Sequence, residues 1–242
     1  MNVRLDKLLV ARGIAESRAK AQALIMAGEI VVSDKVITKA GQSVPEDALI
    51  KVKRPFPYVS RSALKLKAAL DYFSLDIKGE VAIDIGASTG GFTEVLLEYG
   101  ARRVYALDVG HGQLHWKLRN DKRVVTLEGI NARYLKIDMI PEMCDVATFD
   151  VSFISLRLVV GKVKAVLRDG ASIIALVKPQ FEAGRKDVAR GGIVRDANVV
   201  NRVLSDMEKL FKDEGMDIIG IIPAPIKGSG GNQEYLLHAV SR

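Results

Sequence analysis

A glycine-rich turn between an apolar run and a helical pattern is the feature of this chain with the clearest chemistry. Residues 81–85 form an apolar run of strand length, the turn reads GASTGG, and a helical pattern follows from Phe92. Glycines let the backbone approach a ligand closely, and a helix start offers unpaired N–H groups. The next strand-like run stops at Asp108, where an acid can hold the two hydroxyls of a ribose. This spacing predicts a site for an adenosine-containing cofactor.

Two lysines and two acids form a second set of residues that could do chemistry. Ligands of a parallel sheet bind beyond the carboxyl ends of its strands. Asp150 ends the run VATFD, Lys178 ends SIIALV, and Glu234 begins a last strand that runs the other way. Lys65 lies in the helix before the first strand, where a turn could bring it to the same edge. Each residue alone could be a surface charge or a cap, but together the four predict one reactive cluster.

Alternating helical and strand patterns predict the elements that position these residues. After a helix at about 60–73, helical patterns alternate with seven strand-like runs, at 81–85, 103–108, 123–128, 145–150, 171–177, 217–222 and 234–240. Helices are predicted between them, for example at 91–99, 155–168 and 197–214. We therefore predict an α/β fold with a doubly wound, seven-stranded sheet. The one long irregular stretch is 179–195, whose basic side chains could contact RNA phosphates or be plain surface charges.

Residues 1–54 have the pattern of a separate, small α+β domain. Leu5, Leu8 and Leu9 are spaced for one helical face, and Ser17 can cap a second helix that ends near Gly28. Residues 1–60 hold ten Lys/Arg and six Asp/Glu, so they carry 10 − 6 = +4 of the net charge of +7. Two prolines then break any regular element, which predicts a linker at 55–59 before a second domain at 60–242.

The composition limits the classes of protein to which the chain can belong. No segment reaches the roughly 18 apolar residues of a membrane helix, and the N-terminus lacks a signal-peptide core. The single cysteine, Cys144, leaves no intrachain disulfide and no cysteine cluster for zinc. With only three histidines in the chain, we expect His111, His115 and Trp116 to be structural and predict no metal. We expect a cytoplasmic protein, and its pI of 9.4 suggests a polyanionic partner.

The glycine spacing separates two classes of cofactor. A dinucleotide fingerprint reads G-x-G-x-x-G, and the turn at 86–91 lacks its second glycine. A seventh strand that runs antiparallel is typical of S-adenosylmethionine-dependent methyltransferases, and the tail of this chain can supply it. An RNA-binding oxidoreductase that uses NAD remains the alternative.

These motifs resemble the TlyA family, whose members are known as hemolysins and as ribosomal RNA 2′-O-methyltransferases. The N-terminal RLDKLL, the SR before the second helix and the glycine before a V-x-V strand resemble the S4 RNA-binding domain. The second domain is similar to FtsJ-type methyltransferases, whose Lys-Asp-Lys-Glu tetrad maps onto the four residues of the reactive cluster. Ser62 and Leu64 stand where relatives often have Gly and His. The matching motifs are YVSRSALKL (58–66), DIGASTGGFTEVLL (84–97), ALDVGHGQLHWKLRND (106–121), NAR (131–133), DVSFISL (150–156), LVKPQFEAGR (176–185), GGIVRD (191–196) and GNQEYLL (231–237).

The resemblance implies a Rossmann-like class I methyltransferase that uses S-adenosylmethionine and methylates the 2′-hydroxyl of a cytidine in 23S, or 16S and 23S, ribosomal RNA. The short N-terminus favours the large subunit. In this scheme Lys178 is the base, because burial and the nearby ammonium of Lys65 favour its neutral amine. Asp150 and Glu234 would orient the two lysines. The implied cofactor-binding residues are Asp84, Gly86, Ala87, Ser88, Gly90, Gly91, Phe92, Asp108, Val109, Asn131 and Asp150. The implied RNA-binding residues are Arg4, Lys7, Arg12, Arg18, Lys20 and Arg61.

The older name of the family leaves a second alternative, a membrane-lysing toxin. No spanning helix, signal peptide or sustained apolar face in the sequence supports it. The sequence makes no prediction of the oligomeric state.

Overall fold

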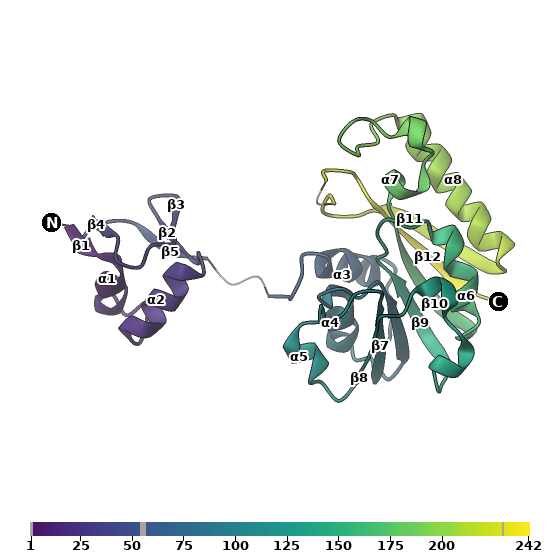
Figure 1. Ribbon diagram of the computed structural model, residues 1–242, viewed down its shortest axis with the longest axis horizontal. Coiled ribbons are helices and arrows are strands. Elements are labelled where there is room, and N and C mark those ends of the chain that lie inside the picture. Colours follow the sequence, from purple (N-terminus) through teal and green to yellow (C-terminus); the bar gives the residue numbers. More distant parts are fainter. Residues whose placement is uncertain (1, 54–56, 229) are drawn as a thin grey trace. The chain divides into compact units, whose positions relative to one another are not determined.

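The computed structural model describes residues 2–53, 57–228 and 230–242, and the chain divides into two units, Met1–Pro57 and Tyr58–Arg242 (Figure 1). Residues 54–56, which include part of the predicted linker 55–59, lie outside the described residues. Each unit has its own hydrophobic core.

The first unit packs two helices against short strands. A two-stranded sheet pairs its first and fourth strands, and a three-stranded sheet has its second strand in the centre. Ser17 caps the second helix as predicted, since its side chain accepts the N–H of Lys20 at 3.2 Å. The elements are β1 (Asn2–Arg4), α1 (Leu5–Ala11), α2 (Arg18–Met26), β2 (Ile30–Val32), β3 (Lys35–Ile37), β4 (Ser43–Pro45) and β5 (Ile50–Val52).

A buried carboxylate anchors the two helices of this unit. Asp6 on α1 is fully buried, and it accepts hydrogen bonds from Arg4 at 2.9 Å, from Arg18 at 3.0 Å and from Gln22 at 3.0 Å. The bond from Arg4 is the main reason why the pKa of Asp6 lies well below its usual range. The arrangement ties α2 to the N-terminal strand through a single charge.

We expect Asp6→Asn to destabilise the first unit by about 2 kcal/mol, because charge-assisted bonds to a buried acceptor are lost. The lowered pKa of Asp6 means that the wild-type contribution is present above the ordinary Asp pKa of about 3.9 and is lost as the pH falls below it. The urea midpoint of the Ile25 and Ile30 methyl NMR signals in the full chain measures the change. The control is Asp34→Asn, which removes an exposed ion pair with Lys51. Equal midpoints for the two variants would contradict the anchor.

The second unit carries the seven-stranded sheet, which confirms the predicted fold. Its strand order is β11-β12-β10-β9-β6-β7-β8. The five strands from β10 to β8 are parallel, and β12 runs antiparallel to both of its neighbours. The strands are β6 (Val81–Ile85), β7 (Arg103–Asp108), β8 (Val124–Glu128), β9 (Cys144–Phe149), β10 (Leu167–Val177), β11 (Met216–Pro223) and β12 (Tyr235–Ser241).

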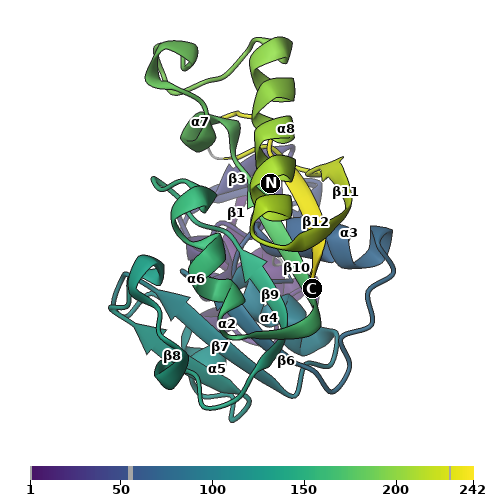
Figure 2. The same cartoon turned by 90° about the vertical axis from the view of Figure 1, so that its right-hand side faces the viewer.

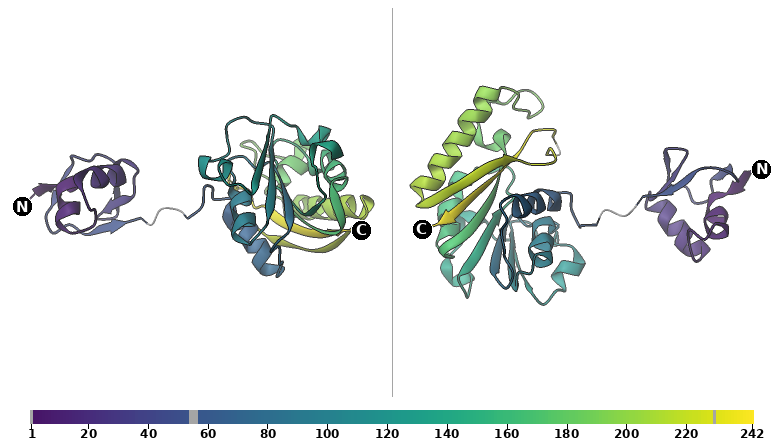
Figure 3. Two further views of the ribbon diagram at one scale, coloured as in Figure 1. Left: turned by 90° about the horizontal axis from the view of Figure 1, so that it is seen from below. Right: turned by 180° about the vertical axis from the view of Figure 1, so that it is seen from behind.

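Helices cover both faces of this sheet, and each face has its own apolar core. On one face of the sheet α8 runs along β11, while α3 and α4 lie on the opposite face (Figures 2 and 3). Alternate residues of β6 point into opposite cores: Ile83 packs with the α6 and α8 residues, and Ala82 packs with the α3 and α4 residues. The helices are α3 (Ala63–Tyr72), α4 (Gly91–Glu98), α5 (Trp116–Arg119), α6 (Val160–Lys164), α7 (Pro179–Glu182) and α8 (Ala197–Asp213). The 3₁₀ turns are η1 (Ala132–Tyr134), η2 (Ile137–Met139), η3 (Leu156–Leu158) and η4 (Arg185–Asp187).

Two predicted segments differ from the structure. The helix predicted at 155–168 is wrong in length, because only η3 and the short α6 form there. The chain already enters the sheet at Leu167, which pairs with Cys144, and an irregularity that includes Gly170 at φ +81° follows. The stretch 179–195, predicted to be irregular, contains α7 and η4.

Candidate active site

The glycine turn needs its first glycine for two independent reasons. Gly86 has φ +86°, a left-handed conformation that side chains disfavour. A Cβ at this position would also lie 2.7 Å from the carbonyl oxygen of Asp150. The turn after β6 therefore passes directly against the end of β9, and it brings the backbone of the two motifs together.

Asp84 stabilises the turn through hydrogen bonds inside the protein. It is fully buried, and it accepts hydrogen bonds from Thr93 at 2.7 Å and from Thr148 at 2.9 Å, which link β6 to α4 and to β9. Burial raises the pKa of Asp84 to about 7, and the two threonine hydroxyls partly oppose that shift. The predicted cofactor contact of Asp84 is therefore corrected: its carboxyl is turned into the protein.

A cavity of about 500 Å³ lies beyond the ends of β6 and β7, and we call it the Asp108 cavity. Each oxygen of the Asp108 carboxylate accepts one backbone N–H, from Ser88 at 2.8 Å and from Gly110 at 2.7 Å. Each oxygen thus keeps a free lone pair, which suits a diol. Val109 and Asn131, both predicted to flank an adenine, also line this cavity, and the Asn131 side chain accepts the N–H of Arg133.

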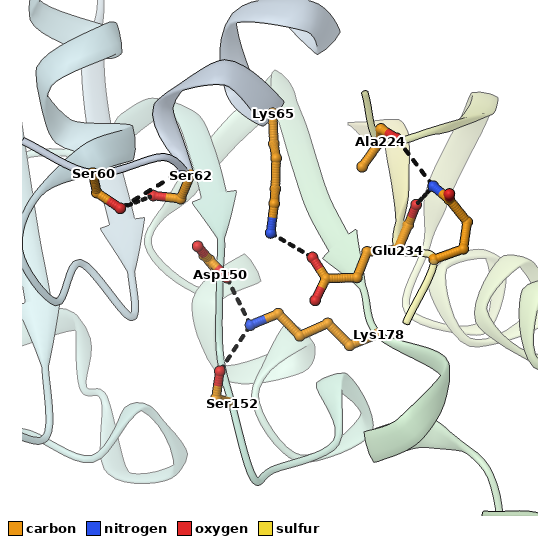
Figure 4. A network of polar contacts seen from close by, with 9 residues as sticks. Ser60, Ser62, Lys65, Asp150, Ser152, Lys178, Ala224 and Glu234 are labelled. Atoms are coloured by element: carbon orange, nitrogen blue, oxygen red, sulfur yellow. Dashed lines mark hydrogen bonds and ion pairs between the residues drawn. The ribbon is translucent and has the colours of Figure 1, made fainter. Parts of the chain in front are cut away.

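Two lysine–carboxylate pairs lie side by side at the carboxyl edge of the sheet (Figure 4). Lys65 Nζ on α3 donates to Glu234 Oε2 at 2.5 Å, and both side chains are almost fully buried. Lys178 Nζ, just after β10, lies 2.7 Å from Asp150 Oδ1 and donates to Ser152 Oγ at 2.8 Å. The structure thus brings together the four residues that the sequence placed at one edge, and it pairs them in a definite way.

These four side chains line a second cavity of about 390 Å³, which we call the Lys178 cavity. Ser60, Arg61 and Ser62 form part of its wall, together with Lys227 from the segment before β12. The two cavities share a set of lining residues, so they adjoin each other. The shared residues are Gly86, Ser88, Asp150, Ser152 and Phe153.

An aromatic pair lies at the junction of the two cavities. The ring of Phe153 is 91% exposed, and its backbone has φ +63°, a strained conformation for a large side chain. The ring of Phe181 on α7 lies 5.1 Å away, centroid to centroid. The ring of Phe153 is therefore open to solvent where the two cavities meet.

The other predicted cofactor residues divide between the cavity walls and the packing behind them. Ala87, Ser88 and Phe92 line the Lys178 cavity. Gly90 and Gly91 are in the lining of neither cavity; a Cβ on Gly90 would collide with Leu114 and Leu118, and one on Gly91 would collide with Ser60 and Ser62. These two glycines allow α4 to pack closely against its neighbours.

Most of the basic residues predicted to bind RNA in the first unit already have partners within it. Arg4 and Arg18 bond Asp6, Lys20 pairs with Glu16 at 2.6 Å, and Arg12 donates to the carbonyl oxygen of Ala48 at 2.7 Å. Lys7 is exposed and has no ion pair among the described residues. Arg4 and Arg18 remain half exposed, so each presents part of its guanidinium to solvent.

Sequence reasoning missed two polar residues of the site. Ser152 contacts Lys178 and lines both cavities. Glu182 accepts the hydroxyl of Ser155 at 2.6 Å and the N–H of Leu156 at 2.8 Å, so it links the segments after β9 and β10. Their position in the matched motifs DVSFISL and LVKPQFEAGR was the available signal.

In the described ranges, no three His, Cys, Asp or Glu side chains gather closely enough to hold a metal ion. None of the helices in the part of the chain that the structure describes combines the length and the apolar character needed to cross a bilayer.

Comparison with known proteins gives matches along the whole chain. The family profile described as FtsJ-like methyltransferase matches residues 58–240, and that of the S4 domain matches residues 3–50. The candidate rRNA methyltransferase YqxC of Bacillus subtilis is 48% identical over 97% of this chain and 84% of its own. The 16S/23S rRNA (cytidine-2′-O)-methyltransferase TlyA of Mycobacterium tuberculosis is 42% identical over 97% of this chain and 88% of its own. Hemolysin A of Brachyspira hyodysenteriae is 41% identical over 98% of this chain and all of its own.

Solved structures agree with these matches. A candidate hemolysin from Streptococcus thermophilus has a TM-score of 0.77 and 41% identity, and the match covers 99% of this chain and 88% of that one. The magnesium protoporphyrin IX methyltransferase of Synechocystis, solved with S-adenosylmethionine bound, has a TM-score of 0.52 at 15% identity over 75% of this chain and 79% of that one, which shows a shared fold. These matches confirm the resemblance that the sequence motifs indicated. The chain belongs to the FtsJ-like methyltransferases and, among them, to the TlyA family.

Proposed function

We propose that this methyltransferase transfers a methyl group from S-adenosylmethionine to the 2′-hydroxyl of a cytidine ribose in ribosomal RNA, with 23S RNA as the substrate and 16S RNA as a second substrate to be tested. The observation that carries the proposal is the junction of two cavities at Asp150 and Ser152, with two lysine–carboxylate pairs side by side in the lining of the Lys178 cavity. Relatives named as rRNA (cytidine-2′-O)-methyltransferases supply the substrate class.

The Asp108 cavity fits the cofactor. Its volume lies in the range of small-molecule sites, and the Asp108 carboxylate has one free lone pair on each oxygen for the two ribose hydroxyls. Val109, Ile130 and Asn131 form a mostly apolar wall for the adenine, and the turn at Gly86 leads toward the Lys178 cavity. When bound, S-adenosylmethionine supplies an electrophilic methyl group on a sulfonium, whose leaving group is a neutral thioether.

The Lys178 cavity fits a nucleotide. The rings of Phe153 and Phe181 offer faces for a base, since exposed aromatic side chains stack on unpaired bases in RNA complexes. Arg61 in the wall can meet a phosphate. The first unit, whose S4 profile match indicates RNA binding, would hold the surrounding RNA through its exposed basic residues.

The two lysines have different roles toward the 2′-hydroxyl: one is the base and the other supplies a positive charge. Lys178 Nζ accepts the hydroxyl proton as the methyl group transfers, and Asp150 stabilises the ammonium that forms. Lys65, held in an ion pair by Glu234, places an ammonium group at the same cavity, where it stabilises negative charge that develops on the ribose oxygen. The walls hold hydroxyl and methyl donor in line, which supplies much of the remaining acceleration.

Two measurements test this function. In calorimetric titrations we expect S-adenosylmethionine to bind and NAD to leave no signal; binding of NAD alone would refute the cofactor. Tritiated methyl transfer to separate 30S, 50S and intact 70S particles identifies the RNA, and mapping of the product gives the modified nucleotide. We expect label in 23S RNA on a ribose 2′-oxygen. The phosphodiester bond on the 3′ side of that nucleotide should then resist alkaline hydrolysis. Label on a base, or no label in any particle, would refute the reaction. The proposed action on ribosomes supports a cytoplasmic location.

A further inference from the structure

The ammonium group of Lys178 has one hydrogen-bond acceptor and one ion-pair partner in the described part of the chain. Its Nζ is bonded to Cε, lies 2.7 Å from Asp150 Oδ1 and donates to Ser152 Oγ at 2.8 Å (Figure 4). The ring centroid of Phe181 is 5.9 Å away, beyond hydrogen-bond distance. One hydrogen bond, to Ser152, and one ion pair, with Asp150, therefore hold this nitrogen.

The direction of the nitrogen lone pair decides whether Lys178 can act as a base. A neutral amine has two N–H groups and one lone pair. When one N–H is bonded to Ser152 and the other is drawn to the Asp150 carboxylate, the lone pair takes the remaining direction, and Lys178 lines the Lys178 cavity. With Asp150 alone, the amine can rotate about its Cε–Nζ bond and present an N–H to the substrate in place of the lone pair.

The backbone holds the Ser152 hydroxyl in place for this task. The segment 150–156 begins at Asp150, whose N–H donates to the carbonyl of Ile85 at 2.9 Å. Its other end is tied to α7 by the two bonds that Glu182 accepts from Ser155 and Leu156. Glu182 lies one helical turn after Lys178, so both partners of the Lys178–Ser152 bond sit on segments that are linked to each other.

From this geometry we propose that Ser152 is a positioning residue for the reaction: with Asp150 it directs the lone pair of Lys178 toward the substrate hydroxyl. The inference rests on the proposed function, in which Lys178 is the base. It concerns kcat and the ordering of Lys178, and it does not require Ser152 to touch the RNA.

The ordering of Lys178 is measured without RNA or cofactor. We expect ¹³Cε relaxation to show an ordered Lys178 in the wild type and in Ser152→Thr, which keeps the hydroxyl. In Ser152→Ala the order parameter should fall toward that of Lys162, an exposed lysine on α6. An equally ordered Lys178 in Ser152→Ala would overturn the inference, whatever the enzyme methylates.

Single-turnover and steady-state methylation of the substrate particle form the second readout. We expect Ser152→Ala to lower kcat about tenfold, with KM for the particle and Kd for S-adenosylmethionine within about twofold, as for a lost orientation of the base. Ser152→Thr should stay within about threefold of the wild type in kcat. The matched control is Ser205→Ala on the exposed face of α8, which should leave all values unchanged.

The outcomes separate the two proposals. A raised KM with unchanged kcat in Ser152→Ala would assign Ser152 to RNA binding and overturn the positioning role. A wild type that methylates no RNA, with Lys178 loosened in Ser152→Ala, would refute the proposed function and leave the contact with Lys178 standing. Loss of kcat in Ser152→Thr as large as in Ser152→Ala, with both variants folded, would also overturn the inference.

Discussion

Lys178→Ala is expected to lower kcat for RNA methylation by about a thousandfold, because the reaction loses its base. The ribose hydroxyl would then have to give its proton to water in a cavity where Lys65 is already bound to Glu234. Binding of S-adenosylmethionine should remain within a few-fold of the wild type, since Lys178 does not line the Asp108 cavity. Quench-flow methyl transfer with saturating cofactor measures the step directly.

Lys178→Arg distinguishes a base from a fixed charge. Arginine keeps the positive charge beside Asp150 but does not release its proton in proteins. We therefore expect Lys178→Arg to be about as inactive as Lys178→Ala, whereas substantial activity in Lys178→Arg would show that the charge alone matters. Lys162→Ala is the matched control on the surface. Because Lys178→Ala leaves the half-buried Asp150 without its partner, thermal unfolding of each variant must accompany the kinetics.

Deletion of residues 1–53 is expected to abolish methylation of ribosomal particles at physiological salt, a loss of at least about a hundredfold in kcat/KM. The first unit would contribute phosphate contacts that are tethered to the catalytic unit, and such contacts act through a high effective concentration. The second unit has two apolar cores made of its own residues, so we expect it to fold and to bind S-adenosylmethionine with Kd within about twofold of the full chain.

Addition of the separate first unit provides the control for this deletion. Without the covalent link it should restore little activity, because the effective concentration is lost. The salt dependence of KM should also be shallower for the shortened chain, since fewer counterions are released on binding. Full activity of residues 54–242 on ribosomal particles would show that the S4 domain does not select the substrate.

Local patterns in the sequence were sufficient to predict most of the strands and helices of the fold. The period of the apolar residues located the seven strands to within a few residues, because each strand buries its own side chains irrespective of its partners. The exception at 155–168 has a clear cause: its apolar residues fit a helix, but Leu167 gains a place in the sheet beside Cys144 and ends the helical segment early. Pairing across the sheet decided a boundary that local periodicity could not.

For the site as well, part could be predicted from the sequence and part depended on the tertiary structure. The sequence by itself determined which residues reach the carboxyl edge of the sheet, since strand ends can be read from the chain: the turn at Gly86, the acid at Asp108, and the two lysines with their carboxylates. Only the tertiary structure decided the pairing of Lys65 with Glu234, which are 169 residues apart, the inward turn of Asp84, and the contact of Ser152 with Lys178. The physical reason is that ion pairs and burial depend on which strands are neighbours, and that order, with β12 antiparallel beside β10, is fixed by packing between distant segments.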